Sequence, residues 1–343
     1  MHQRQFHLFI TPKFYQKCYE YGLFGVSEIN MNQLANVHKS DIAFFYTTRS
    51  IGPRTVGEIY GPFEVISEMF FNSNLVWVSQ STGSKDDKFP IRVKVCLLPE
   101  HVCTNPIPVQ ALWDLRQEGK IRSIMDSSAL TNKAVTSLLE QDGILLLQKL
   151  LQRNQIPMLD KSVYRGHSFV ENPIKIMDFK GSQVKEFRLE AQLESYLLMN
   201  RRQLMKLSGF PSEESDVFQM RILNQVGTYI AGGSIDIVCM YEKKVIDLWL
   251  LLNTSVIELK KGVLSADSVE QIVEYIEWAT RIIPGSRREM IKGILIGRNF
   301  ANQFEKRESV VQTVKRFRSL YNIECYQYIV NQSENAVEFD KVI

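Results

Sequence analysis

The sequence has few cysteines and no long apolar run, and each absence excludes a class of protein. Its 343 residues include five cysteines, an odd number without Cys-x-x-Cys spacing. Such usage argues against a disulfide framework and against a cysteine-ligated zinc site, and it favours reduced thiols. No run of about 18 apolar residues occurs, and the beginning lacks the pattern of a signal peptide. We therefore expect a cytoplasmic protein without a membrane span.

The length and the order of sequence patterns predict two domains. A chain of 343 residues exceeds one ordinary hydrophobic core. From residue 6 to about residue 99, short apolar runs broken by Gly, Pro and Asn are typical of strands in a small barrel, and residues 106–154 are typical of helices. We assign residues 1–154 to the first domain, and residues 155–182, which contain several Pro and Gly, to a linker or connecting segment.

The remainder, residues 183–343, mixes helix and strand patterns. An amphipathic helix over 184–207 is followed by a run of strands and then by alternating helix and strand. This order favours an α/β domain with a central mixed sheet. The fold class predicted for the whole chain is therefore α+β, with a barrel and its helices followed by this second domain.

One strand of the second domain carries an acid and a base on the same side. In the stretch Val256–Gly262, Glu258 and Lys260 are two residues apart, so both point to one face of a strand. Asp236 is the one acid in another apolar strand, directly after Gly232 and Gly233. A buried Asp is costly unless it is paired or bound to metal.

Two chemical interpretations of these three residues stay open. Asp236 and Glu258 could bind Mg²⁺, which needs few protein oxygens, while Lys260 orients the attacking water or neutralises a phosphate. Alternatively, Asp236 and Lys260 form a buried salt bridge and Glu258 points outward.

Two helices carry further polar pairs at a spacing of four residues, which places each pair on one helix face. Glu190 and Glu194 precede the Asp236 strand, and Gln271 and Tyr275 follow the Lys260 strand. The glutamates could join the site or lie on a solvated face.

Together these motifs resemble the PD-(D/E)XK nuclease superfamily, in particular its RecB-like branch. That family has a helix with a glutamate, a Gly-then-Asp strand, an ExK strand and a helix with QxxxY. The stretch from Val256 to Ala279 is especially similar to the NucS-type endonucleases, and the resemblance covers roughly residues 185–300. It implies Mg²⁺, or Mn²⁺ in its place, and it implies these catalytic residues: Asp236, Glu258, Lys260, Glu190, Gln271 and Tyr275. Asp236 and Glu258 would be the metal ligands, and Glu190 fits the helix motif better than Glu194.

The chain departs from the family pattern between the two metal ligands. Twenty-one residues separate Asp236 from Glu258, with the apolar segment 245–254 between them. This insertion could be a protruding hairpin or a dimerisation element. Asp247 within it is an alternative second ligand.

The first domain carries aromatic residues rather than a catalytic set. Alternate strand positions, two of Phe44, Phe45 and Tyr46, are expected in the core, and Phe24 and Trp77 beside turns could line a pocket. Alternatively, all of these aromatic residues are core. The order of elements over about 6–98 resembles the EVE domain, a PUA-like barrel related to YTH domains. Such domains hold a modified base flipped out of nucleic acid. The resemblance implies a pocket formed by Phe24, Gly25, Val26, Ser27, Trp77 and Phe45. Phe24 stands where the family has tryptophan.

The two resemblances together predict a prokaryotic, modification-dependent restriction endonuclease. It would flip a methylated or hydroxymethylated base of double-stranded DNA into the barrel and cut nearby, and a double-strand cut predicts a homodimer. The alternatives are a NucS-like repair nuclease for mismatched or branched DNA, and a non-catalytic reader of modified nucleic acid.

Contacts to the DNA backbone must come from local clusters of charge. Residues 181–343 carry 21 Lys and Arg against 21 Asp and Glu, so they produce no overall basic field. Clusters of basic residues are the expected backbone contacts, namely Arg201, Arg202, Arg287, Arg288, Lys315 and Arg316. Such contacts make binding weaker as salt rises.

Overall fold

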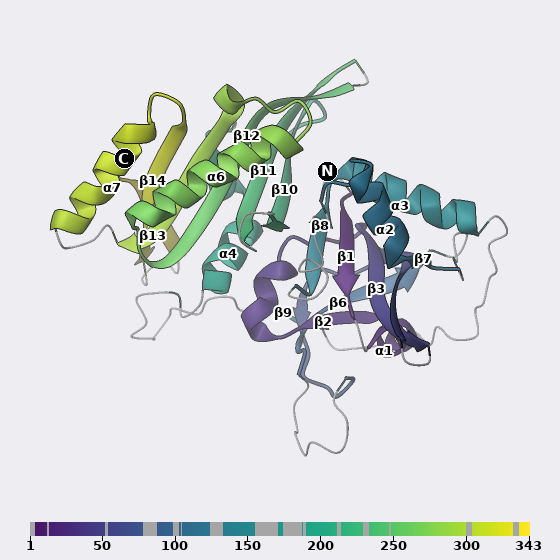
Figure 1. The fold of residues 1–343 in the computed structure, drawn as a ribbon. Helices are drawn as coiled ribbons and strands as arrows, with labels where there is room; N and C mark the ends of the chain where they lie inside the picture. The colour runs from purple at the N-terminus through teal and green to yellow at the C-terminus, as the bar shows by residue number, and fades with distance from the viewer. Residues whose placement is uncertain are drawn as a thin grey trace. The chain divides into compact units, whose positions relative to one another are not determined.

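The computed structural model describes most of the chain and divides it into two compact units, residues 2–174 and residues 175–343 (Figure 1). The described residues are 4–11, 14–51, 54–77, 88–98, 103, 105–123, 133–154, 171–173, 187, 190–210, 214–228, 233–246, 248–299, 304–331 and 336–343. Among them, no helix combines the length and the apolar composition that crossing a bilayer requires. All five cysteines are free thiols.

The first unit is a curled, barrel-like sheet with helices. Its strands are β1 (Phe6–Ile10), β2 (Leu23–Val26), β3 (Ile42–Ile51), β4 (Arg54–Val65), β5 (Phe70–Phe71), β6 (Ile91–Leu97), β7 (Ile107–Pro108), β8 (Val135–Leu138) and β9 (Asn172–Pro173). Its helices are α1 (Tyr15–Tyr21), the 3₁₀ helix η1 (Glu28–Gln33), α2 (Val109–Gln117) and α3 (Glu140–Arg153). The strands follow the order β8-β1-β3-β4-β6-β5-β9, with β2 joined to β6 and β7 to β4. β1 and β3 run parallel, and their apolar side chains pack beneath α2 and α3.

The second unit is an α/β fold with a mixed six-stranded sheet in the order β10-β11-β12-β13-β14-β15. Its strands are β10 (Phe218–Gly227), β11 (Ser234–Val245), β12 (Leu248–Val263), β13 (Ile291–Asn299), β14 (Asn322–Asn331) and β15 (Ala336–Lys341). Its helices are α4 (Glu190–Met199), α5 (Arg201–Ser208), α6 (Ala266–Ile282), the 3₁₀ helix η5 (Arg288–Met290) and α7 (Phe304–Phe317). β12, β13 and β14 are parallel, and the other neighbouring strands are antiparallel. The predicted fold class, two separate sheets in an α+β chain, is confirmed.

Helices α5 and α6 cover opposite faces of the second sheet. A Cβ added to Gly293 on β13 would lie 2.9 Å from Ile276 of α6, so α6 sits directly on the strand. The neighbouring Lys292 reaches Gly209 at the end of α5. Because successive strand residues point to opposite faces, the two helices lie on opposite sides.

Several predicted elements need correction. The helix predicted over 184–207 is two helices, because Asn200 leaves helical geometry between α4 and α5. Within 106–154, which the pattern assigned to helices, β8 pairs with β1 and completes an edge of the first sheet. Residues 74–81 are one of the apolar runs between 6 and 99 that are typical of strands, and their described part, 74–77, has no strand geometry.

The predicted linker lies mostly outside the described residues. In its described part, β9 pairs with β5, and Lys94 on β6 forms a 2.5 Å ion pair with Glu171. Residues 171–173 are therefore integrated into the first unit.

Candidate active site

The two acids of the predicted metal site face each other on adjacent strands. The regular pairing of β11 with β12 stops at Ile237–Ile257, and one residue beyond it Asp236 lies opposite Glu258. The Asp236 Oδ2 atom accepts a hydrogen bond from the backbone N–H of Leu259 at 2.8 Å. Both acids are almost completely buried, at 8% and 3% exposure.

Burial and mutual repulsion strongly affect the protonation of these acids. Burial raises the pKa of Asp236 well above its usual range, and the carboxylates of Glu258 and Glu194 raise it further. Burial also raises the pKa of Glu258, although the neighbouring Lys260 ammonium acts in the opposite direction. Two carboxyl groups so placed repel each other and require a cation or a proton between them.

Lys260 supplies positive charge at one side of this pair and is held by α6. Its Nζ atom donates to Glu258 Oε1 at 2.5 Å and to Gln271 Oε1 at 3.2 Å. Gln271 in turn donates to the Tyr275 hydroxyl at 2.6 Å, and this hydroxyl donates to the Ser234 carbonyl at 3.0 Å. Burial alone would lower the pKa of Lys260, but Glu258 outweighs burial and raises it.

These contacts exclude one of the two interpretations of the acid–base pattern, and the metal site stays a prediction. Lys260 pairs with Glu258, and Glu258 is buried rather than outward-pointing. The alternative of an Asp236–Lys260 salt bridge with an exposed Glu258 is therefore wrong. The spacings i, i+2 on the strand and i, i+4 on α6 bring Glu258, Lys260, Gln271 and Tyr275 into one chain of hydrogen bonds.

A residue that the sequence analysis missed, Gln225 on β10, joins the site from a third strand. Its side-chain amide donates to Asp236 Oδ1 at 3.2 Å and to Glu194 Oε2 at 2.7 Å. Its backbone has φ 51°, a left-handed conformation that is rare for a residue with a side chain. Such strain often marks a functional position, and no local sequence pattern signals it.

The two helix glutamates have different environments. Glu194 is 2% exposed and reaches Asp236 through Gln225. Glu190 instead accepts the backbone N–H of Lys261 at 3.0 Å, and it acts on the pKa of Asp236 only as the last of several causes. Glu194 is thus linked by hydrogen bonds to Asp236, whereas Glu190 raises the pKa values of Glu258 and Lys260. The motif-based choice of Glu190 stays a prediction.

The donor set suits a hard divalent cation such as Mg²⁺. Glu258 Oε2 is buried and has no hydrogen-bond partner within the described part of the chain. No group of three or more acidic, histidine or cysteine side chains that could hold a metal occurs among the described residues. Mg²⁺ needs only one or two carboxylates because it keeps several waters. Asp236 and Glu258 therefore fit this ion.

Asp247, the alternative ligand, lies outside the described residues. Its neighbours Val245 and Leu248 pair at the end of the β11–β12 hairpin. Val245 is nine residues from Asp236 along β11, a run of about 30 Å at ~3.3 Å per residue. Of the acids that the structure describes on these two strands, Asp236 and Glu258 lie at one end of the pair, and Glu242, which pairs with Leu251, lies toward the other.

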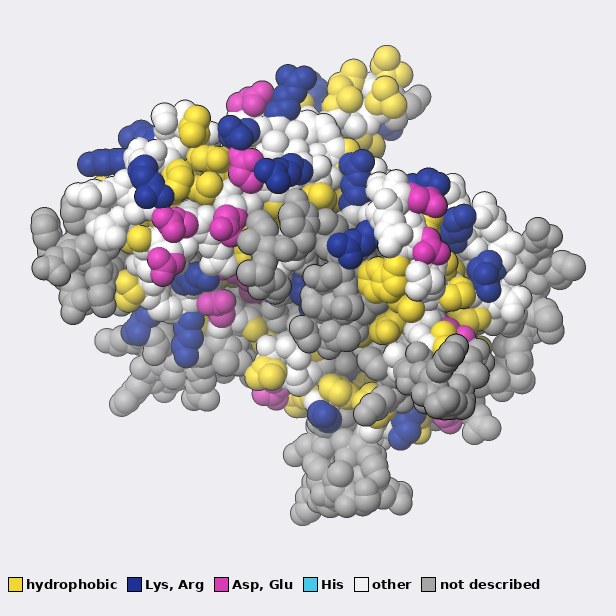
Figure 2. Space-filling view, in the orientation of Figure 1, with side chains coloured by type: hydrophobic (Ala, Val, Ile, Leu, Met, Phe, Trp, Pro, Cys, Tyr) yellow, Lys and Arg dark blue, Asp and Glu magenta, His cyan; other side chains and the backbone are white. Residues whose placement is uncertain are grey.

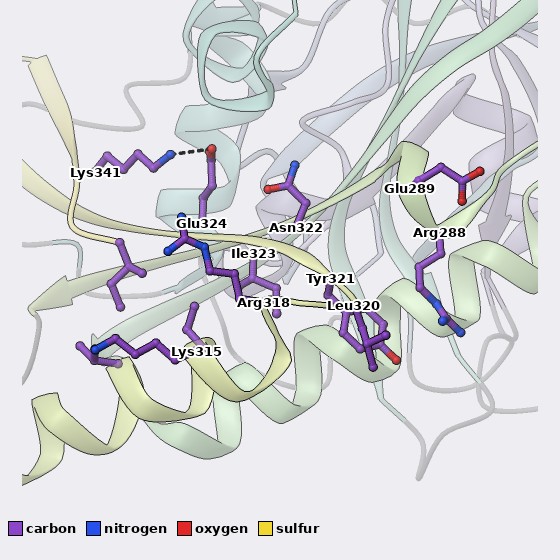
Figure 3. A pocket seen from close by; sticks show the side chains of 13 residues that line it. Arg288, Glu289, Lys315, Arg318, Leu320, Tyr321, Asn322, Ile323, Glu324 and Lys341 are labelled. Atoms are coloured by element: carbon purple, nitrogen blue, oxygen red, sulfur yellow. Dashed lines mark hydrogen bonds and ion pairs between the residues drawn. The ribbon is translucent and has the colours of Figure 1, made fainter.

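The predicted backbone contacts fall into separate places. Arg288 and Lys315 line one cavity of about 550 Å³, together with Arg318 and Lys341 (Figure 3). This cavity also contains acid, because Glu324 pairs with Lys341 at 2.6 Å.

The other predicted basic contacts do not line this cavity. Arg316 pairs with Glu270 at 2.9 Å, and Arg201 pairs with Glu214 at 2.6 Å. Arg202 and Arg287 are exposed. Two of the six predicted contacts, Arg288 and Lys315, therefore line this cavity, and the role of all six in DNA binding stays a prediction.

The predicted base pocket is occupied by the protein's own side chains. Phe24 and Phe45 are 2% and 1% exposed and belong to the core, and Phe24 stacks on Phe9 with ring centres 4.2 Å apart. Trp77 is 4% exposed and lies against Gly25, whose added Cβ would meet the indole at 2.8 Å. Val26 is likewise buried, whereas Ser27 is partly exposed.

Half-buried aromatic side chains lie elsewhere in the first unit. Tyr15 and Tyr60 stack with ring centres 4.6 Å apart, and Tyr19 lies 6.1 Å from Tyr15. The Tyr60 hydroxyl donates to Glu58 at 2.8 Å. This tyrosine cluster, residues 15, 19 and 60, combines partly accessible ring surface with a nearby carboxylate.

Comparison with known proteins finds only distant likenesses. No family model matches the chain, and no curated protein matches it. A hypothetical protein from Leishmania major is 12% identical, with 44% of this chain and 98% of that chain covered and a TM-score of 0.33. Human THYN1 protein, solved with DNA containing 5-methylcytosine, is 13% identical, with 43% and 97% covered and a TM-score of 0.30. Apo EndoMS is 9% identical, with 82% and 65% covered and a TM-score of 0.23.

Proposed function

We propose that residues 175–343 form a metal-dependent endonuclease that hydrolyses phosphodiester bonds in DNA, and that residues 2–174 select a modified base. The observation that carries the nuclease half is the buried pair Asp236 and Glu258. They face each other beside Lys260, and one Glu258 carboxylate oxygen has no hydrogen-bond partner among the residues that the structure describes. A bound divalent cation would supply activation of water and stabilisation of charge on phosphate oxygens.

The chain's own residues would prepare this reaction in three ways. Asp236 and Glu258 hold negative charge at one point, which favours the cation. Lys260 stays protonated at neutral pH because its pKa is raised, so it acts as a cation and hydrogen-bond donor toward phosphate or water rather than as a general base. Gln271 and Tyr275 fix the Lys260 ammonium through their hydrogen bonds.

The base-selecting half rests on the EVE resemblance and requires different residues from those first expected. Phe24 and Phe45 are core residues, so a flipped base cannot stack on them without unpacking the barrel. The tyrosine cluster offers half-buried rings on which a flipped base could stack, beside the buried Glu58 carboxylate that accepts the Tyr60 hydroxyl. We assign the base site to this cluster.

Digestion of matched plasmids tests both halves together. Plasmids that differ only in cytosine or adenine methylation are incubated with the protein in Mg²⁺ and in EDTA, beside an Asp236→Asn control. The proposal expects cutting only with Mg²⁺, only by the unaltered protein, and faster on one methylated plasmid. Equal cutting of all plasmids would contradict the proposed selection of a modified base. The absence of nicking on every plasmid would contradict the proposed nuclease.

Cleavage of a mismatched duplex distinguishes the proposed nuclease from the main alternative, a repair nuclease. A repair nuclease of the NucS type would use the same Asp236–Glu258 pair but prefer a mismatch over a modified base. Tyr60→Ala distinguishes the two substrates, because it should abolish a preference for modified DNA and leave mismatch cutting unchanged.

A further inference from the structure

The strands that carry Asp236 and Glu258 continue beyond the rest of the sheet as an apolar hairpin. Figure 1 shows β11 and β12 running on together past their neighbours, and hydrophobic side chains gather at that end in Figure 2. The strands show a register shift between Tyr241 and Glu242, and β10 accompanies β11 as far as Lys243, so residues 244–246 and 248–249 extend beyond β10. We call residues 242–246 and 248–251 the arm.

The two faces of the arm differ in chemistry. Directly paired residues share a face, and Val245 pairs with Leu248 while Lys243 pairs with Leu250. The Lys243 ammonium lies 5.3 Å from the Phe218 ring, toward the base of the arm. The rest of this face is apolar and open, because Val245, Leu248 and Leu250 are 42%, 68% and 47% exposed.

The residue at the turn of the arm is also better suited to contact with another protein surface than to exposure to water. Ile246 is 88% exposed and has φ 58°, which is a genuine outlier for a β-branched residue. Hairpin turns with positive φ ordinarily use Asn or Gly. An isoleucine here is unfavourable in two ways, because its backbone is strained and its apolar side chain is exposed to water. Strained positions of this kind cluster at binding sites.

We infer that the arm joins two copies of this chain, with the apolar face of one arm packed on the apolar face of the other. Beyond Lys243 the arm has only two strands, an arrangement that is marginally stable in water without further packing, and a second copy would supply that packing. Nucleic acid is a poor occupant, because the described part of this face offers no cation except Lys243.

The exposed area fits a dissociable dimer. The exposed parts of the apolar arm residues amount to on the order of 400 Å² per copy, from the areas implied by side-chain transfer energies. Two arms with their flanks would bury about 1,000 Å² in total, at the low end for specific complexes. We therefore expect a dimer with a dissociation constant in the micromolar range.

The position of the arm suggests a function for the dimer, and this function rests on the proposed nuclease. Both strands lead from the arm straight to Asp236 and Glu258, so pairing two arms couples two sites that each cut one DNA strand. A two-fold contact of this kind is the commonest arrangement in soluble homo-oligomers.

Sedimentation velocity on the full chain tests the dimer without using activity. The unaltered protein should form a dimer across about 0.1–100 µM, the range expected for an interface of this size. Leu248→Lys with Leu250→Lys should raise the dissociation constant at least 100-fold. Ile329→Lys is the matched control, because Ile329 is a strand residue of the same unit with 43% exposure, and it should leave the dimer intact.

A shortened hairpin guards against misfolding of the charged variant. Replacing residues 243–250 by Asn-Gly keeps the Glu242–Leu251 pair and the sheet below it, and it should also give monomers. A monomeric unaltered protein would overturn the inference and show that something else covers the arm, such as residues 2–174 of the same chain or another protein. A dimer that survives both arm variants would overturn it equally.

Plasmid nicking keeps this inference separate from the proposed function. Arm variants should still nick supercoiled plasmid but lose linearisation. A dimer that never cleaves DNA would end the nuclease proposal alone, whereas a monomer that makes double-strand cuts would end the arm inference alone.

Discussion

The two units each bury an aspartate, and the surroundings of the two acids differ in a way that separates structure from chemistry. Asp41 in the first unit is fully buried and accepts hydrogen bonds from the backbone N–H groups of Gln5 and His38, at 2.9 Å each, and from the His7 ring at 3.0 Å. Asp236 in the second unit accepts from Leu259 and Gln225 but faces another acid, Glu258.

This difference shows what each acid contributes. The donors around Asp41 compensate its charge and tie β1 to the segment before β3, so its role is stability. The acids around Asp236 concentrate like charge, one oxygen of Glu258 has no partner among the described residues, and the neighbouring Gln225 has a left-handed backbone conformation. An arrangement that is costly to the fold but well suited to a cation indicates function.

The largest expected difference between the two acids is in cleavage. Asp236→Asn should lower the rate of Mg²⁺-dependent DNA cleavage by about 10³-fold or more, because a ligand of the cation that stabilises the transition state is lost. Asp41→Asn should change it less than about threefold, since Asp41 hydrogen-bonds to Gln5, His7 and His38 within the first unit. Single-turnover cleavage of one labelled duplex measures both, and equal losses would erase the distinction.

The two substitutions, Asp41→Asn and Asp236→Asn, should change the free energy of unfolding in opposite directions. Asp41→Asn should lower the free energy of unfolding by about 2 kcal/mol, because charge-assisted hydrogen bonds to a buried acceptor are weakened. Asp236→Asn should raise it by about 1 kcal/mol in EDTA, because the repulsion with Glu258 is removed. Urea unfolding at pH 7.5 reports both values, and destabilisation by Asp236→Asn would contradict our account.

Gln225 tests whether the third strand positions the metal ligands. Gln225→Ala should reduce cleavage about 10-fold, since neighbours that orient metal ligands typically contribute this much. The pH–rate profile should also move, because Asp236 loses a hydrogen-bond donor to its charged form and its pKa rises further. Gln225→Asn, which shortens the amide, is the control for backbone effects; an unchanged profile in Gln225→Ala would limit Gln225 to a structural role.

The raised pKa values of Asp236 and Glu258 predict a pH-dependent penalty on folding. Both folded pKa values lie above those of the unfolded chain, so the folded state holds these protons longer. Their contribution to stability therefore falls as pH rises from about 4, the ordinary carboxyl value, to the raised folded values. We expect the free energies of unfolding of the unaltered chain and of Asp236→Asn, measured in EDTA between about pH 4 and 8, to differ more as the pH rises. A difference in free energy of unfolding that stays constant with pH would contradict the raised pKa values of Asp236 and Glu258.

The smallest expected effect concerns the basic cavity. Lys315→Ala should lower the slope of log affinity against log salt by about 1, as expected for one lost phosphate contact. Arg316→Ala, on the same helix but paired with Glu270, should leave the slope unchanged. Fluorescence anisotropy with one duplex at several salt concentrations measures both, and identical slopes for the two variants would exclude Lys315 as a phosphate contact.

Local spacing predicted much of the site, and long-range pairing accounts for what it missed. The i, i+2 and i, i+4 rules placed Glu258 beside Lys260 and Gln271 beside Tyr275, and both pairs are in contact. Gln225 escaped because only the β10–β11 register brings it to Asp236.

The same limits explain the other differences between sequence and structure. β8 escaped because its four residues are recognisable as a strand only through their pairing with β1. Aromatic content alone does not distinguish a pocket wall from a core residue, and the stack of Phe24 on Phe9 makes it the latter.

Binding of Mn²⁺, followed by electron paramagnetic resonance at pH 8, tests most directly whether Asp236 and Glu258 hold a divalent cation. The unaltered chain should bind Mn²⁺ at a site that Mg²⁺ competes for, and Glu258→Gln should weaken that binding at least 10-fold, with Asp41→Asn as an unaffected control. Equal binding by the unaltered chain and Glu258→Gln would contradict the metal site and the nuclease built on it.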